Sequence, residues 1–276
     1  MRYGITTFAT DKSMDVAELA REAEDRGLDS LYIPEHSHIP ASRETPAPSG
    51  DDELAEEYRR AVDPFVTLAA AAATTERISL GTGICLVAQH DPIIIAKTVA
   101  TLQNLSQGRF VFGIGFGWNV EEMRNHGVDY STRRARVREH ILAMKTLWED
   151  DEASFEGEFV RFDRVWAWPK PDVPVPVLVG GGAGPKLFSH VAEYADGWIP
   201  IGGSGLTRAI PELRSLLEDA GRDPAALRVV PFGSSPDPGK LEHFERIGVT
   251  ECVFPLPSAG RDVVLPILDT QADLLE

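Results

Sequence analysis

Cysteines, long apolar runs and basic residues are all scarce in this chain of 276 residues. It has two cysteines, Cys85 and Cys252, each inside an apolar run, which excludes a disulfide framework and suits a reducing, cytoplasmic compartment. No apolar stretch approaches the ~20 residues that a membrane-spanning helix needs. The opening MRYGITTF lacks the cationic and apolar regions of a signal peptide, so we expect none.

The charge is strongly one-sided. Acidic residues outnumber basic ones 43 to 27, which gives a net charge of -16. A field of this sign disfavours nucleic acid and anionic membranes as partners. We expect neither partner. The charge leaves a small-molecule substrate open.

Eight short apolar runs alternate with amphipathic helical patterns. Strands are expected at 2–8, 29–34, 78–86, 109–115, 175–180, 196–201, 227–233 and 251–256. Helices are expected at 14–26, 64–76, 92–105, 131–149, 185–195, 207–220 and 237–247. This alternation predicts parallel strands, and eight units favour one α/β domain over 1–276, a (β/α)8 TIM barrel. An open, doubly wound sheet is the alternative.

Two connections are too long for ordinary loops between a strand and a helix. Residues 35–62 follow the second strand, and residues 116–174 follow the fourth. Insertions at the carboxyl ends of barrel strands commonly form lids and pocket walls. We therefore expect the functional site beside these two segments.

The fourth strand carries three glycines spaced two apart, Gly113, Gly115 and Gly117. In an extended strand they share one face, and the bulky residues between them share the other. We expect the glycines to face the barrel interior and to open a cavity at its mouth. Small residues that merely accommodate large neighbours are the alternative. The spacing is not that of a dinucleotide-binding fingerprint.

A glycine-rich turn, Gly180-Gly181-Gly182-Ala183-Gly184, closes the fifth strand and is followed by a proline and a helical pattern. Free backbone N–H groups at a helix start bind anions, so this turn is a candidate phosphate site. The pair Gly202-Gly203, after the next strand, could complete it. A turn with no ligand is the alternative.

Titratable residues cluster at the end of the second strand, in the run Glu35-His36-Ser37-His38. This position in a barrel favours catalysis, and His36 is the best candidate for a proton donor or a hydrogen-bonding anchor. An exposed loop histidine is the alternative, and it is the favoured one for His38. We expect no metal site, because later strand ends offer no further ligand set.

Aromatic and basic residues gather in the second insertion. Its aromatic residues could wall an apolar pocket or form a small core of their own: Trp118, Tyr130, Trp166 and Trp168. Its arginines could hold a polyanionic group, although pairing with nearby glutamates is favoured for at least three of them: Arg124, Arg133, Arg134, Arg136 and Arg138.

Taken in order, several motifs resemble the bacterial luciferase-like oxidoreductases, and among them the branch that uses the deazaflavin coenzyme F420. The motifs are LGTGICL, DPIIIAKTVATLQNLSQGR, FVFGIGFGWNVEEM, RRARVRE, FEGEFVRF and PVLVGGGAGPKLF followed by ADGWIPI. The similarity runs from the first strand to about residue 203. It implies a luciferase-like TIM barrel whose ring-shaped cofactor lies across the mouth, with its phosphate in the glycine-rich turn.

The resemblance also assigns roles to individual residues. His36 matches the family's histidine beside the reactive ring, preceded by Glu35, and both are predicted catalytic residues. A non-prolyl cis peptide is implied between Gly83 and Ile84. The predicted cofactor-binding residues are Thr7, Thr82, Gly83, Ile84, Cys85, Trp118, Gly180, Gly181, Gly182, Ala183, Gly202 and Gly203. Trp118 stands where some sugar-phosphate-oxidising relatives have an acidic residue, which favours a more apolar substrate.

We therefore expect an F420-dependent oxidoreductase that transfers hydride between the deazaflavin and an organic, fairly apolar substrate. An FMN-dependent luciferase-like monooxygenase is the alternative, because both cofactors carry a flat ring and a phosphate. The Arg133 and Arg134 region could meet the anionic tail that distinguishes F420. The substrate, the direction of hydride transfer and homodimer formation are left open by the sequence.

Overall fold

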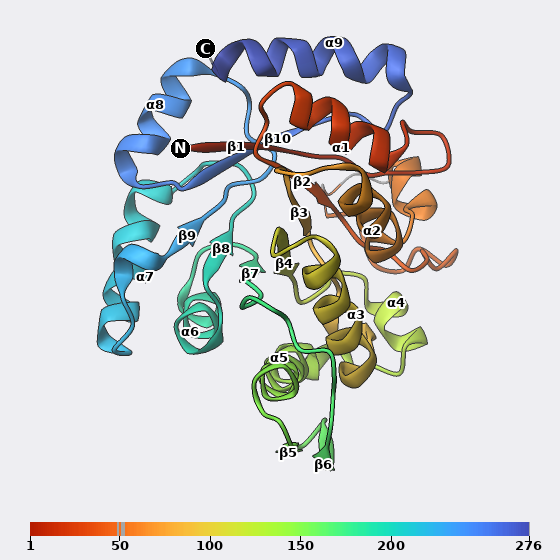
Figure 1. The fold of residues 1–276 in the computed structure, drawn as a ribbon, viewed down its shortest axis with the longest axis vertical. Coiled ribbons are helices and arrows are strands. Elements are labelled where there is room, and N and C mark those ends of the chain that lie inside the picture. The colour runs from red at the N-terminus through yellow and green to blue at the C-terminus, as the bar shows by residue number, and fades with distance from the viewer. Residues whose placement is uncertain (49, 51–52, 276) are drawn as a thin grey trace.

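A computed structural model describes residues 1–48, 50 and 53–275. Eight parallel strands stand at its centre, with helices around them (Figure 1). The strands are β1 (Arg2–Thr6), β2 (Ser30–Ile33), β3 (Ser79–Thr82), β4 (Phe110–Ile114), β7 (Val177–Gly180), β8 (Gly197–Ile199), β9 (Arg228–Val229) and β10 (Glu251–Pro255). Each lies within one of the eight predicted strands.

The strands pair in the order β10-β1-β2-β3-β4-β7-β8-β9. The two outer strands then meet, because the Thr250 N–H donates to the Val229 carbonyl at 3.0 Å and the Val253 N–H donates to that of Pro231 at 3.0 Å. Parallel pairing of Phe232 with Val253 continues this contact. The sheet therefore closes into the predicted barrel, and the open-sheet alternative is wrong.

All seven predicted helices are present: α1 (Val16–Asp25), α2 (Pro64–Thr74), α3 (Pro92–Leu105), α5 (Arg133–Glu149), α6 (Pro185–Tyr194), α7 (Leu206–Asp219) and α8 (Pro238–Ile247). Asp63 and Asp91 cap α2 and α3 by accepting hydrogen bonds from N–H groups of the first turn. Short 3-10 helices are η1 (Glu56–Arg60), η2 (Val87–Gln89), η3 (Tyr130–Thr132), η4 (Pro224–Ala226) and η5 (Asp273–Leu275). Over the described residues, no helix combines the length and apolarity needed to cross a membrane.

Further elements were not placed by the sequence patterns. The second insertion holds α4 (Val120–Asn125) and an antiparallel hairpin of β5 (Ala153–Glu156) and β6 (Arg161–Val165), which projects from the barrel in Figure 1. Most hairpin residues are at least partly exposed, so its apolar signal is weak. The last helix, α9 (Arg261–Ala272), contains Pro266, which by sequence rules argues against a helix.

The two faces of β4 divide the core as predicted. Phe110 and Phe112 belong to the large apolar layer between barrel and helices, whereas Val111 belongs to a smaller cluster inside the barrel. Gly113 faces inward: a Cβ there would lie 2.1 Å from the Thr82 carbonyl oxygen. At this position the glycine accommodates a neighbouring backbone and does not itself line a cavity.

We predict that Gly113→Ala destabilises the barrel by about 1–3 kcal/mol, because the added methyl group meets the backbone of β3, which cannot rotate away. Urea unfolding followed by circular dichroism measures the loss. Gly182→Ala is the matched control, since nothing lies within 4 Å of a Cβ at that position. Equal stabilities of the two variants would contradict the close approach of β3 and β4.

Candidate active site

A cavity of about 620 Å³ opens at the carboxyl ends of the barrel strands. Residues at or within a few positions of the carboxyl ends of all eight strands contribute to its lining, as do parts of both insertions. Its volume lies within the roughly 300–1,000 Å³ of typical small-molecule sites. The cavity therefore occupies the place where TIM barrels carry their catalytic residues.

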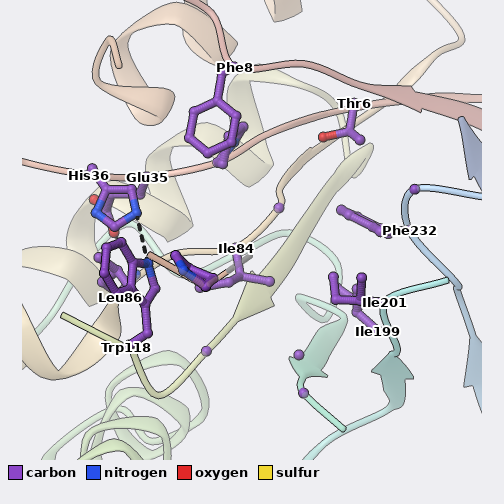
Figure 2. Close-up of a pocket in the computed structure, with 18 of the residues that line it drawn as sticks. Thr6, Phe8, Glu35, His36, Ile84, Leu86, Trp118, Ile199, Ile201 and Phe232 are labelled. Carbon is purple, nitrogen blue, oxygen red and sulfur yellow. Dashed lines mark hydrogen bonds between the residues drawn. The ribbon is translucent and has the colours of Figure 1, made fainter. Parts of the chain in front are cut away.

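The walls are mainly apolar and come from opposite sides of the barrel. Figure 2 shows His36, Leu86 and Trp118 on one side and Ile199, Ile201 and Phe232 on the other, with Ile84 between them. The peptide between Gly83 and Ile84 is cis, as predicted. Above the barrel interior, Ile84 thus forms a central part of the cavity wall.

His36 is buried at this wall and both its ring nitrogens have partners. Nδ1 lies 2.9 Å from Oε2 of Glu122, and the indole Nε1–H of Trp118 points to Nε2 at 3.4 Å. The ring of Tyr58, from η1, lies with its centroid 5.4 Å from that of His36. Burial raises the pKa of Tyr58, so its hydroxyl stays protonated at neutral pH.

Glu35 is also buried at the cavity wall and binds the segment that follows the cis peptide. Its carboxylate accepts hydrogen bonds from the Leu86 N–H at 2.6 Å and from His90 Nε2 at 2.8 Å. Burial on its own would raise the pKa of Glu35, but these donors hold it below its usual range, while Glu35 raises the pKa of His90. Glu35 therefore fixes the shape of the wall behind Ile84.

Potential metal ligands meet at this point, since one ligand atom each of Glu35, Cys85 and His90 lies within 4.8 Å of the others. The carboxylate already has two N–H donors. Burial, and then the charge of Glu35, raise the pKa of the Cys85 thiol well above its usual value. A thiol that resists deprotonation is a poor metal ligand. We therefore interpret these three residues as a buried hydrogen-bonded cluster and not as a metal site.

Glu121 attaches the first insertion to the second. Its carboxylate accepts hydrogen bonds from the backbone N–H groups of Glu44 and Thr45, at 2.7 and 3.0 Å, and from the Thr45 hydroxyl. Burial acts to raise the pKa of Glu121, but these hydrogen bonds outweigh it and bring the pKa to about 2. The insertion also supplies Pro48 to the cavity lining.

The glycine-rich turn reaches the cavity only through its first two residues, Gly180 and Gly181. Arg133 and Arg134, from the first turn of α5, line the same cavity. They stack on Tyr130 and Phe116, and neither forms an ion pair with a carboxylate of the described residues. Two half-buried cations in an acidic protein thus border the mouth.

The predicted site residues divide into two groups. Those that line the cavity are Thr7, Glu35, His36, Gly83, Ile84, Trp118, Gly180 and Gly181. Those outside its lining are Thr82, Cys85, Gly182, Ala183, Gly202 and Gly203. Thr82 is fully buried and its hydroxyl donates to the Gly113 carbonyl, whereas Ala183 lines a smaller pocket between α6 and α7.

The clusters of the second insertion also separate. Trp118 reaches the cavity, but Trp166 and Trp168 are exposed, by 77% and 57%, and they neither line this cavity nor belong to the core of the described residues. Among the described residues, Arg124 and Arg138 pair with glutamates, whereas pairing was favoured for at least three of the five arginines. The cavity residues that the sequence reasoning missed include Phe8, Tyr58 and Phe232, because an isolated aromatic residue carries no signal of its distant neighbours.

Together these features define a parallel-barrel enzyme with a deep apolar site, a buried histidine and a cationic rim. The chain belongs to the luciferase-like monooxygenase family, whose family model matches residues 2–235. The match extends about thirty residues further than the motifs identified in the sequence, which end near residue 203. The chain is therefore a luciferase-like oxidoreductase of a family that uses F420 or FMN.

Individual proteins and a solved structure are also similar to this chain. An uncharacterized protein of Mycobacterium tuberculosis is 42% identical over 266 residues, 95% of this chain and 94% of that protein. An F420-dependent glucose-6-phosphate dehydrogenase of Kineococcus radiotolerans is 33% identical over 215 residues; the match covers 75% of this chain but 59% of the dehydrogenase. A solved F420-dependent secondary alcohol dehydrogenase, in complex with an F420-acetone adduct, shares the fold with a TM-score of 0.77 at 21% identity, covering 100% of this chain and 97% of that one.

We predict that the Glu35–His90 pair stabilises the protein most between about pH 4.5 and 6.5. The contribution of Glu35 is complete above its ordinary pKa of 4.5 and is lost as the pH falls through its lowered pKa. That of His90 is complete below its ordinary pKa of 6.5 and is lost as the pH rises through its raised pKa. His90→Gln should therefore cost about 1 kcal/mol in that window and less outside it.

Thermal unfolding at a series of pH values measures this difference. Glu121→Gln is the control, because Glu121 has no histidine partner and its stabilisation is lost only toward acid. The pH range of about 4 to 9 spans the ordinary pKa values of both Glu35 and His90. A stability difference between wild type and His90→Gln that stays constant over this range would show that the pair is not ionic.

Proposed function

We propose that this protein is an F420-dependent oxidoreductase that transfers hydride between the deazaflavin and an organic, fairly apolar substrate. The observation that carries the proposal is the cavity at the barrel mouth, which joins an apolar interior to a cationic rim. When bound, the cofactor supplies the hydride donor or acceptor. The residues of the chain bind it, orient the substrate and exclude water.

Two features of the described residues fit such a cofactor. Gly115, Gly180 and Gly181 border the cavity without side chains of their own, and Ile84 packs against the first two, so the wall leaves room for a flat group beside Ile84. Arg133 Nε and Arg134 Nη1 are buried without a hydrogen-bond partner among those residues. An anionic group would satisfy them, and we assign them to the phosphate or tail of the cofactor.

The choice of F420 rests on two supports. Relatives named F420-dependent glucose-6-phosphate dehydrogenases match 66% to 81% of this chain at 27% to 33% identity. In addition, F420 carries more negative charge than FMN, and two neighbouring arginines suit the more anionic ligand. An FMN-dependent monooxygenase is the second candidate, because an apolar cavity suits the flat flavin ring of FMN as well as the deazaflavin ring of F420.

The lining of the cavity supports a substrate less polar than a sugar phosphate. Trp118, Tyr58 and Phe8 surround the approach to His36, and Leu86 and Phe232 add apolar surface. A polyhydroxylated sugar would lose hydrogen bonds to water at these walls without gaining equivalent partners. We therefore expect an alcohol, ketone or similar compound with an apolar body.

We predict that Arg134→Gln weakens F420 binding by about tenfold, because a charge-assisted hydrogen bond to an anion is lost. Titration of the purified protein with F420 and with FMN, followed by fluorescence, measures both dissociation constants. Arg136→Gln is the matched control, since Arg136 lies on the same helix, stacks on Phe159 and does not line the cavity. Tighter binding of FMN than of F420 would reverse the assignment.

His36→Ala should keep cofactor affinity within about threefold and lower turnover by on the order of 10²-fold, because the ring nitrogen that faces the cavity is lost. Screening with F420 against small alcohols and ketones identifies a substrate for this measurement. Wild-type turnover in the His36→Ala enzyme would leave the histidine with a structural role.

A further inference from the structure

His36 is held by the buried carboxylate of Glu122, which has no role in the function proposed above. Oε2 of Glu122 lies 2.9 Å from Nδ1 of the histidine, and the side chains are 1% and 6% exposed. The other oxygen of the same carboxylate, Oε1, accepts a hydrogen bond from the Ser37 N–H at 3.3 Å. Both oxygens of Glu122 are thus committed to the segment that carries His36.

The position of Glu122 is fixed by the N-terminal turn of α4. It lies in the first turn of α4, where its backbone N–H donates to Oδ1 of the capping residue Asn119 at 3.0 Å. Asn119 is buried, as is Met123 on the following position of the helix. The Glu122 carboxylate is therefore held toward His36 by a capped helix end that packs in the core.

The chemistry of the two partners specifies one protonation state of the histidine. A carboxylate can only accept a hydrogen bond, so Nδ1 of His36 must donate the proton to Glu122. The indole N–H of Trp118 can only donate, so Nε2 must accept it, along the contact drawn as a dashed line in Figure 2. Two independent contacts thus require the same neutral tautomer, with the proton on Nδ1.

We propose that Glu122 is the positioning residue of this site: it keeps the His36 proton on Nδ1, so that Nε2 presents a lone pair at the cavity wall. A ligand group that displaces the Trp118 N–H from Nε2 must then be a hydrogen-bond donor, such as a hydroxyl. This deepens the proposed function, on which its catalytic consequence rests. The tautomer itself does not depend on that function.

The adjacent residue Glu121 distinguishes this role from a purely structural one. It is also a buried carboxylate in the first turn of α4, but it binds Glu44 and Thr45 of the first insertion and does not touch His36. Replacing either glutamate removes a buried charge and its hydrogen bonds. Only replacement of Glu122 removes the acceptor at Nδ1.

The test is the ¹⁵N chemical shift of the His36 ring in protein without cofactor, assigned by comparison with His36→Gln. Wild type should show a protonated Nδ1 and an unprotonated Nε2. Glu122→Gln should shift the population toward the Nε2–H tautomer, because a glutamine amide can also donate to Nδ1. Glu122→Asp should restore the Nδ1–H tautomer at least in part, and Glu121→Gln should leave it unchanged.

Turnover and affinity complete the experiment. Glu122→Gln should lower kcat by on the order of 10²-fold, with the F420 dissociation constant within about threefold of wild type. A wild-type His36 that carries its proton on Nε2 overturns the proposal without any variant, which also covers a Glu122→Gln protein that fails to fold. An unchanged tautomer in folded Glu122→Gln overturns it as well.

The two proposals fail differently. If the shifts behave as expected but neither F420 nor FMN binds, the proposed function is wrong and the role of Glu122 in setting the tautomer stands. If F420 binds and turns over while the tautomer is independent of Glu122, the function stands and the positioning role is wrong.

Discussion

The close approach of β3, β4 and β7 at the mouth of the barrel is the constraint on which the site depends. A Cβ at Gly113 would meet the Thr82 carbonyl oxygen, and one at Gly115 or Gly180 would meet the side chain of Ile84. Because these three positions lack side chains, Ile84 can occupy the centre of the mouth without filling it. The cavity above is left with Ile84 at its centre and with aliphatic and aromatic side chains around it.

The barrel could be predicted because its strands and helices carry strong local signals. Each strand lies in a short, mainly apolar run, and α2 and α3 begin with an aspartate followed by a proline. The β5–β6 hairpin and α9 lacked such signals: the hairpin buries little surface, and Pro266 lies within α9. Pro266 removes one backbone N–H from α9, and the helix tolerates this loss as α7 tolerates Pro211.

The site was predictable mainly where a residue lies near the end of a strand. Glu35 and His36 lie just after β2 and Gly180 is the last residue of β7, and parallel strands bring their carboxyl ends to one rim. The partners of these residues come from positions far away in the sequence. Glu122 lies 86 residues from His36, and Tyr58 reaches it from η1. Their roles depend on how the insertions pack, which no local pattern reports.

The adjacent glutamates of α4 show how the insertions and the site are connected. Successive residues on a helix point about 100° apart, so Glu121 faces the first insertion while Glu122 faces the end of β2. Both carboxylates are buried, and both lie at the N-terminal end of α4, where negative charge is favoured. A displacement of α4 would therefore move the wall of the cavity and the hydrogen-bond acceptor of His36 together. This coupling gives the second insertion a role beyond covering the barrel, since it sets the geometry of the histidine around which the site is built.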